Sequence, residues 1–229
     1  VTVVRDSVGP TVSITSPADG LVTQAASVTL SYTATDDLDA SPSCNLANGS
    51  SVSLSAGSNT ITVTCQDDAG NSGSASVTVI RDNVSPVVDI TAPADGLVTA
   101  ASSIAIDFTS TDNQDASLVC GPPVGMTTGH VATLSAGPNT ITVNCTDDAG
   151  NTGSDTITVH RDNVAPAISI TSPSNGSQAQ VGSTLTVSYT STDNYDSSPS
   201  CTPASGSTVT VVDGPNVITV TCEDNVGNV

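Results

Sequence analysis

Apolar and polar residues alternate along short segments of the chain, and turns rich in Gly, Pro, Asp and Asn separate these segments. In the first third of the chain the intervening turns read "PADG", "DDLDASP", "SAGSN" and "DDAGNSG". No segment carries the 3.6-residue apolar period of an amphipathic helix. The alternation predicts strands, with a short extended stretch around Cys44, at residues 11–15, 27–35, 51–55, 59–65 and 74–80.

This pattern occurs three times in the sequence. The segment "RDSVGPTVSITSPADGLVT" begins at residue 5 and returns, with substitutions, from residues 81 and 161, and "NTITVTCQDDAGN" from residue 59 returns from residues 139 and 216. Short strands without helices favour a two-sheet sandwich. We therefore expect an all-β chain of three tandem immunoglobulin-like β-sandwich domains arranged end to end. The expected boundaries are 1–5 for the last strand of a preceding repeat, 6–82 for repeat 1, 83–162 for repeat 2 and 163–229 for repeat 3 without its final strand.

The first residues, "VTVV" at 1–4, have the sequence of the strand that closes the first two copies, "VTVI" at 77–80 and "ITVH" at 157–160. A sandwich without this strand exposes an unpaired edge. Two interpretations fit. Neighbouring repeats of a longer array supply the strands, or the first strand of each copy completes the last domain of the next copy.

Each copy contains two cysteines. Pairing within the copy is the simplest of the 15 possible connectivities, and we expect each bridge to join neighbouring strands within one sheet. Closing a loop of about 20 residues stabilises a domain by roughly 3 kcal/mol. Disulfides indicate an oxidising, extracytoplasmic compartment, and the alternative is free buried thiols. The predicted bridges are Cys44–Cys65, Cys120–Cys145 and Cys201–Cys222.

The chain is strongly acidic. It has 22 acidic residues against three basic ones, a formal charge of −19, only 2% aromatic residues and no Trp. This charge excludes nucleic-acid and anionic-membrane partners, and cations are the natural ligands. No apolar run is long enough to span a membrane. His130 and His160 lie at non-equivalent positions, no catalytic constellation emerges, and we expect no enzyme activity.

Four acidic positions and one Asn recur in every copy, in the linker, the loop after the second strand and the last hairpin. These three regions meet at one pole of an immunoglobulin-like sandwich, and hard oxygen ligands suit calcium. The alternative is that each Asp only completes its own turn. Arg5, Arg81 and Arg161 each precede a linker Asp and are expected to neutralise part of the acidic pole. The candidate Ca²⁺ ligands are Asp6, Asp36, Asp39, Asp67, Asn71, Asp82, Asp112, Asp115, Asp147, Asn151, Asp162, Asp193, Asp196, Asp224 and Asn228.

The blocks at 81–96 and 201–228 resemble the hyalin-repeat (HYR) domains and related bacterial immunoglobulin-like repeats of secreted and surface proteins. The shared features are a linker Asp followed by Pro, a Cys leading into a Ser-Gly step, and a closing "D-x-x-G-N". The usual aromatic residue before the Gly of "SAG" is missing. The resemblance implies stalk, spacer or adhesion modules at the cell surface or outside the cell.

Two functions remain open on the sequence. The first is a structural stalk or filament whose junctions calcium stiffens, with copies of itself or neighbouring repeats as head-to-tail partners. The second is an adhesin or carbohydrate-binding accessory module, with glycans as partners. The second function predicts an exposed aromatic platform or a distinctive loop, for which Tyr195 and the altered segment 121–133 are the candidates.

Overall fold

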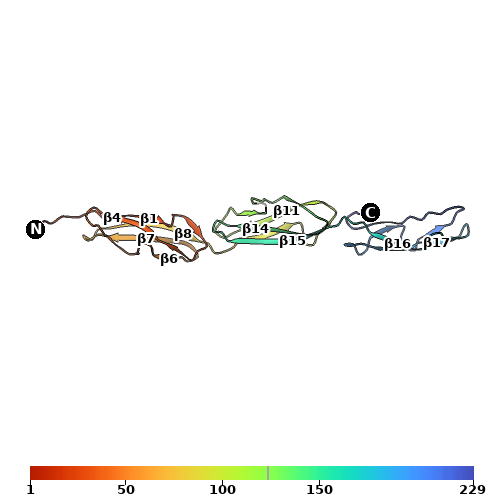
Figure 1. Ribbon diagram of the computed structural model, residues 1–229, viewed down its shortest axis with the longest axis horizontal. Coiled ribbons are helices and arrows are strands. Elements are labelled where there is room, and N and C mark those ends of the chain that lie inside the picture. The colour runs from red at the N-terminus through yellow and green to blue at the C-terminus, as the bar shows by residue number, and fades with distance from the viewer. Residues whose placement is uncertain (123) are drawn as a thin grey trace. The chain divides into compact units, whose positions relative to one another are not determined.

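The computed structural model describes residues 1–122 and 124–229, and this part of the chain forms strands and turns without any helix (Figure 1). Consequently, no helix in the described part is long and apolar enough to cross a membrane. Internal contacts divide the chain into two compact units, and the second repeat contributes to both. The first unit is Val1–Asp89, Thr109–Met126 and Val143–Asp155, and the second is Ile90–Phe108, Thr127–Thr142 and Thr156–Val229. The prediction of an all-β chain is confirmed.

The first repeat is a sandwich built around a small aliphatic core. One sheet has the strand order β2-β8-β7-β5, and the pairs β1-β4 and β3-β6 form the opposite layer. Along β7 every second residue is buried or half-buried, and Leu30, Val63 and Val79 have no exposed surface. The strands are β1 (Thr11–Ser16), β2 (Leu21–Thr23), β3 (Ser27–Thr29), β4 (Ser31–Thr35), β5 (Ser43–Cys44), β6 (Ser51–Ser53), β7 (Gly57–Gln66) and β8 (Ser72–Arg81).

Two details of this repeat differ from the alternation pattern. The strand predicted at 27–35 is interrupted at Leu30, whose backbone N–H donates to the Ser50 carbonyl at 2.9 Å. In addition, β2 pairs in parallel with the end of β8, Leu21 lying opposite Val79. The alternation predicted no strand at residues 21–23, because three residues are too few to show a period.

The second repeat has the same layers, and the third repeat contains shorter strand pairs. The sheets of the second repeat have the orders β10-β15-β14-β12 and β13-β11-β9; the pairs of the third are β16-β18, β17-β20 and β19-β21. The second repeat contains β9 (Val87–Ala92), β10 (Val98–Thr99), β11 (Ser103–Thr111), β12 (Val119–Gly121), β13 (His130–Thr133), β14 (Gly137–Thr146) and β15 (Thr152–Arg161). The third contains β16 (Ala167–Ser172), β17 (Thr184–Thr186), β18 (Ser188–Thr192), β19 (Ser200–Thr202), β20 (Thr208–Thr210) and β21 (Thr221–Glu223).

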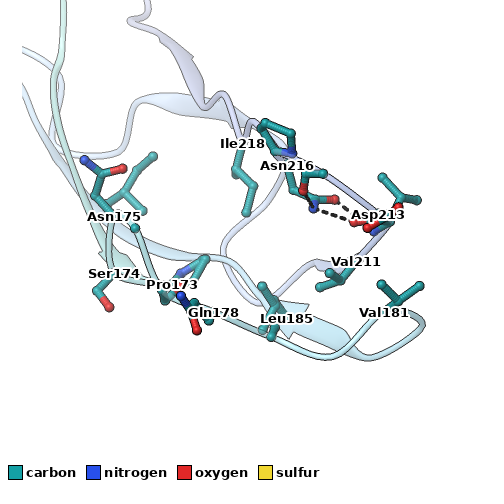
Figure 2. A pocket seen from close by; sticks show the side chains of 17 residues that line it. Pro173, Ser174, Asn175, Gln178, Val181, Leu185, Val211, Asp213, Asn216 and Ile218 are labelled. Carbon is teal, nitrogen blue, oxygen red and sulfur yellow. Dashed lines mark hydrogen bonds between the residues drawn. The ribbon is translucent and has the colours of Figure 1, made fainter.

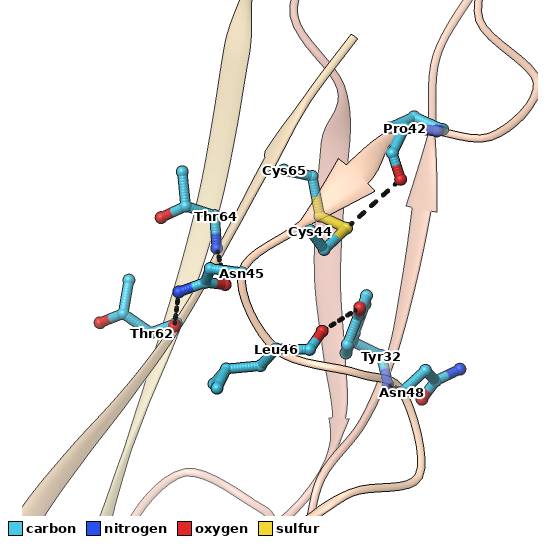
Figure 3. Close-up of a disulfide and its surroundings, with 9 residues drawn as sticks. All are labelled: Tyr32, Pro42, Cys44, Asn45, Leu46, Asn48, Thr62, Thr64 and Cys65. Atoms are coloured by element: carbon cyan, nitrogen blue, oxygen red, sulfur yellow. Dashed lines mark hydrogen bonds between the residues drawn. A yellow bond between two sulfur atoms is a disulfide. The ribbon is translucent and has the colours of Figure 1, made fainter.

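Each repeat has one disulfide, and all three are the pairs expected from the sequence. Cys44 of β5 lies directly opposite Cys65 of β7, with Cα atoms 4.0 Å apart, so the bridge lies within one sheet (Figure 3). The Asn45 side chain then continues the ladder, because its Oδ1 accepts from the Thr64 N–H and its Nδ2 donates to the Thr62 carbonyl. Three structural disulfides are typical of proteins in oxidising compartments.

The linkers enter the first two repeats over the last hairpin. A Cβ atom added to Gly73 would collide with the carbonyl of Pro10, and one added to Gly153 would collide with the carbonyl of Pro86. Only glycine therefore permits the linker to approach the hairpin backbone this closely. This approach brings the acidic residue of the linker near the two other acidic loops.

Candidate cation sites where the linkers enter the repeats

Two of the three linker aspartates are buried, and Asp6 is half-buried. Asp82 is 2% exposed and Asp162 has no exposed surface, although burial of an unpaired charge is costly. The backbone N–H of Asp82 donates to the Thr23 carbonyl of β2 at 2.9 Å, which fixes the linker to the preceding repeat. Each side chain closes a turn, since its Oδ1 accepts the N–H of Val84 or Val164 at 3.1 Å. One carboxylate oxygen of Asp82 and of Asp162 is therefore already hydrogen-bonded within its own turn.

The first Asp of the loop that follows β4, β11 or β18 also closes a turn with one carboxylate oxygen. In the second repeat, Asp112 Oδ1 accepts the N–H groups of Gln114 and Asp115 at 2.9 and 3.1 Å. Asp36 and Asp193 make the same pair of bonds in their own loops. The loop conformation is thus encoded by the Asp at its first position.

The second oxygen of these aspartates has no hydrogen-bond partner although it is buried. This holds for the Oδ2 atoms of two linker residues and three loop residues, namely Asp82, Asp162, Asp36, Asp112 and Asp193. A buried acceptor without a donor costs about 1–3 kcal/mol, and more when it is charged. Because the same atom is left bare in every loop, the pattern points to a ligand that the side chains themselves do not provide.

The Asp of the last hairpin supplies the third carboxylate. Asp147 is 6% exposed and accepts two bonds from Asn151, from the backbone N–H at 2.7 Å and from Nδ2 at 2.8 Å. The same Nδ2 donates to the Asp82 carbonyl at 3.1 Å, so the Asn joins the hairpin to the linker. In the third repeat, Asn228 makes the corresponding bonds to Asp224 and to the Asp162 carbonyl. The recurring Asn acts here as a positioning residue.

These hairpin bonds stabilise the charged form of the Asp. Burial of Asp67 disfavours its charge, but N–H donors from the side chain and backbone of Asn71, and from the backbone of Gly70 and Ala69, outweigh burial and lower the pKa. The pKa of Asp224 is lowered for the same reasons, with Asn228 as the main donor. The carboxylates of Asp67 and Asp224 are therefore ionised at neutral pH.

The structure brings one oxygen of each of three aspartates within 4.8 Å of one another in every repeat. At this separation two charges repel by about 0.9 kcal/mol in water and about 3.5 kcal/mol at the effective dielectric constant near a protein surface. A divalent cation would turn this repulsion into attraction, and carboxylate oxygens are calcium ligands. The clusters are Asp6, Asp36 and Asp37 in the first repeat, Asp82, Asp112 and Asp147 in the second, and Asp162, Asp193 and Asp224 in the third.

Not every predicted ligand lies in these clusters. Among the described residues, the first cluster takes Asp37 in place of the predicted Asp67. Asp39 and its counterparts Asp115 and Asp196 are also outside. Asp39 Oδ1 accepts the N–H of Ser41, and its Oδ2 accepts the N–H of Asp68 at 3.2 Å. One oxygen closes a turn within the loop and the other joins the loop to the hairpin, which a recurring Asp in the sequence does not reveal.

The arginines also differ from the expectation. Arg81 and Arg161 donate from Nη1 to the carbonyls of Leu54 and Leu134 at 3.3 Å, within their own repeats. Among the described residues, no ion pair joins an arginine to the acidic clusters. The guanidinium groups of Arg81 and Arg161 therefore stabilise their own sandwiches.

The layers, the cross-strand disulfides and the convergence of three loops at one pole define a tandem array of immunoglobulin-like β-sandwich domains. The family model described as "Glucodextranase, domain B" matches residues 10–83 and again residues 86–163. The chain belongs to this family. No curated protein matches the sequence.

Several solved structures are similar to the chain at low identity. The fibronectin(III)-like modules of Clostridium thermocellum CbhA are 15% identical, with a TM-score of 0.40, over 66% of this chain and 93% of theirs. SGBP-B of the Bacteroides ovatus mixed-linkage glucan utilization locus, in complex with a heptasaccharide, is 12% identical, with a TM-score of 0.26, over 97% and 66%. The human desmocollin-1 ectodomain is 13% identical, with a TM-score of 0.27, over 96% and 57%.

Proposed function

We propose that this chain is a non-catalytic structural segment of an extracellular stalk or filament, in which calcium stiffens the junctions between repeats. The observation that carries the proposal is the pair of bare, buried Oδ2 atoms at each of two junctions, from Asp82 with Asp112 and from Asp162 with Asp193. A turn Asp that only satisfies its own loop needs no second oxygen in a buried place. A calcium ion needs several such oxygens at once.

The linkers support a stiff junction. The linker between the first two repeats is bound to both of them: the Asp82 N–H donates to the Thr23 carbonyl of the first repeat, and the Asp82 carbonyl accepts from Asn151 of the second. Pro86 and Pro166 are buried and fix the backbone at the entry to their repeats. Three disulfides are in keeping with a location outside the cell or at its surface. The resemblance to hyalin repeats, which implies stalk, spacer or adhesion modules, supports the same proposal.

Small-angle X-ray scattering and thermal unfolding, each in calcium and in chelator, test the stiffening. We expect a shorter average maximum dimension and a lower melting temperature after chelation. The double variant Asp112→Asn with Asp193→Asn should show neither change. If the wild-type chain has the same dimension and melting temperature in both buffers, calcium does not stiffen the junctions.

A carbohydrate-binding accessory module is the second candidate, because the family model is described as a domain of a glucodextranase. The aromatic side chains argue against it. Tyr195 is half-buried, and its ring packs on His160 with centroids 5.1 Å apart. In the segment 121–133, Met126 is buried, Val124 is exposed, and Pro123 lies outside the described residues. Retention on immobilised α- or β-glucans would favour this second function.

A further inference from the structure

In the first repeat, the end of β8 is held by a short strand that runs parallel to it. β2 pairs with β8 so that Thr23 lies opposite Arg81. The antiparallel pairing of β8 with β7 ends where Gly57 lies opposite the same Arg81. One residue further, the Asp82 N–H donates to the Thr23 carbonyl at 2.9 Å. The linker Asp therefore extends the ladder between β2 and β8 at a point that β7 does not reach.

The second repeat has the same arrangement at the end of β15. Thr99 of β10 lies opposite Arg161, and the Asp162 N–H donates to the Thr99 carbonyl at 2.9 Å. The pairing of the short strand with the long strand is parallel here too. The use of the linker Asp as a backbone donor to the preceding repeat is thus common to both junctions.

A turn fixes the start of each parallel pair. Asp19 Oδ1 accepts the Thr78 N–H at 2.8 Å, and Asp95 Oδ1 accepts the Thr158 N–H at 2.7 Å. In the third repeat the same turn position is Asn175, which lines a pocket of about 780 Å³ (Figure 2). In the first two repeats, the parallel pair is thus fixed at its start by the turn and at its end by the linker Asp.

The linker Asp also belongs to the acidic cluster of the following repeat. Asp82 is 2% exposed, its buried Oδ2 has no hydrogen-bond partner, and one of its carboxylate oxygens lies within 4.8 Å of oxygens of Asp112 and Asp147. Its carbonyl accepts from Asn151 of the second repeat at 3.1 Å. The N–H of Asp82 therefore stabilises one repeat, while its carbonyl and carboxylate belong to the next.

We propose that a cation bound at a junction stabilises the parallel strand pair of the preceding repeat, through the linker Asp that the two share. This inference rests on the proposed calcium sites and adds their effect on the neighbouring repeat. A cation on the carboxylate of Asp82 fixes this residue, and its N–H then remains on the Thr23 carbonyl. Fraying of the end of β8 has to break both contacts. Asp162, which has no exposed surface, has the same role between the second and third repeats.

The coupling is reciprocal. If the cation stabilises the strand pair of the preceding repeat, the intact strand pair raises the affinity of the junction for the cation by the same factor. In a stalk, tension between neighbouring repeats passes through the linker. A cation at the junction would therefore strengthen the point at which tension enters the preceding repeat.

Amide hydrogen exchange followed by NMR tests the coupling in the whole chain. At a calcium concentration 100 times the dissociation constant, an opening that releases the cation becomes about 100-fold rarer, so the Asp82 and Asp162 amides should exchange about 100-fold more slowly than in chelator. The Leu30 amide, which donates to the Ser50 carbonyl within the first repeat, is the internal control and should not change.

The melting temperature, measured in the same two buffers, separates this inference from the function on which it rests. If calcium raises the melting temperature but leaves the exchange of the Asp82 and Asp162 amides unchanged, the coupling is wrong and the cation sites stand. If calcium changes neither quantity, the cation sites and the coupling are both wrong.

Two matched variants assign the effect to one junction at a time. Asp112→Asn should remove the calcium response of the Asp82 amide and leave that of the Asp162 amide, and Asp193→Asn should do the reverse. Both variants keep the Oδ1 acceptor that closes their own loop. A calcium response of the Asp82 amide that survives Asp112→Asn would contradict coupling through this junction.

Proline substitutions in the short strands test the reciprocal effect. Val22 of β2 and Val98 of β10 both lie in a parallel pair, and Pro has no N–H for the ladder. Val22→Pro should weaken calcium binding at the junction of Asp82 by about fivefold or more and leave the junction of Asp162 unchanged, and Val98→Pro should do the reverse. A calcium titration followed at the amide signals of each hairpin Asn measures both affinities. Unchanged affinities in both variants would overturn the proposal.

Discussion

Replacing Asp162 by Asn should stabilise the third repeat in chelator and remove the response of this repeat to calcium. Asn keeps the Oδ1 acceptor that bonds the Val164 N–H and the Asn194 side chain. It removes the charge that faces Asp193 and Asp224 within 4.8 Å. Without a cation, the wild-type side chain is therefore a source of repulsion.

The magnitude follows from the two charge pairs that the substitution removes. Each pair repels by about 0.9 kcal/mol in water and about 3.5 kcal/mol at an effective dielectric constant of 20. Because Asp193 is half-exposed, the lower figure is the better guide, and we expect a gain of about 2 kcal/mol in chelator. For a domain of this size, that is a rise in melting temperature of roughly 10 °C.

In calcium, the wild-type chain should be more stable than Asp162→Asn, which is the reverse of their order in chelator. At a concentration 100 times the dissociation constant, binding stabilises the third repeat of the wild-type chain by about 2.7 kcal/mol, and the third repeat of the variant gains little. Differential scanning calorimetry in both buffers measures this crossover. Asp95→Asn is the control, because Asp95 holds the Thr158 N–H at 2.7 Å outside the clusters. If Asp162→Asn lowers the melting temperature equally in both buffers, Asp162 is only a turn residue.

Three further predictions concern the frame around the sites. Gly153→Ala should destabilise the second repeat by more than about 3 kcal/mol in urea unfolding, because its Cβ would collide with the Pro86 carbonyl, while Ser154→Ala should have little effect. Replacing both cysteines of the first repeat by Ala should cost about 3 kcal/mol, since the bridge closes a loop between positions 21 residues apart. Asn71→Ala should raise the pKa of Asp67. The lowered pKa stabilises the fold above about pH 4 and this contribution is lost as the pH falls through the folded-state value, so the variant should be less stable at pH 7 and less sensitive to pH below 4. A wild-type pH profile in this variant would contradict the assignment.

The sequence predicted the long strands and the disulfides well, because they depend on local alternation and on position within the repeat. It did not predict β2, whose three residues are a strand only because β8 lies beside them. The extended strand β7 has no equal in the third repeat, where β21 covers only Thr221–Glu223 although the local sequence is nearly the same. Pairing, and not propensity, decides the length of this strand.

The candidate sites were predicted in part. Recurrence of acids in three loops predicted that they would converge, and the structure brings Asp82, Asp112 and Asp147 together. The recurrence of an Asp in the sequence does not show which of its carboxylate oxygens is hydrogen-bonded within a turn. Asp115 recurs as faithfully as Asp112, but its oxygens accept the N–H groups of Ser117 and Asp148. Only the hydrogen-bond geometry separates an Asp with a bare oxygen from an Asp that is fully used.

Terbium luminescence is the most direct measurement of a cation at these sites. Tyr195 lies between Asp193 and Asp196 in one acidic loop, and an excited tyrosine transfers energy to a terbium ion bound beside it. We predict saturable luminescence that calcium displaces and that Asp162→Asn abolishes, while Tyr32→Phe leaves it intact and Tyr195→Phe removes it. Luminescence that is absent, that magnesium and calcium displace equally weakly, or that persists in Asp162→Asn would contradict a calcium site at this junction.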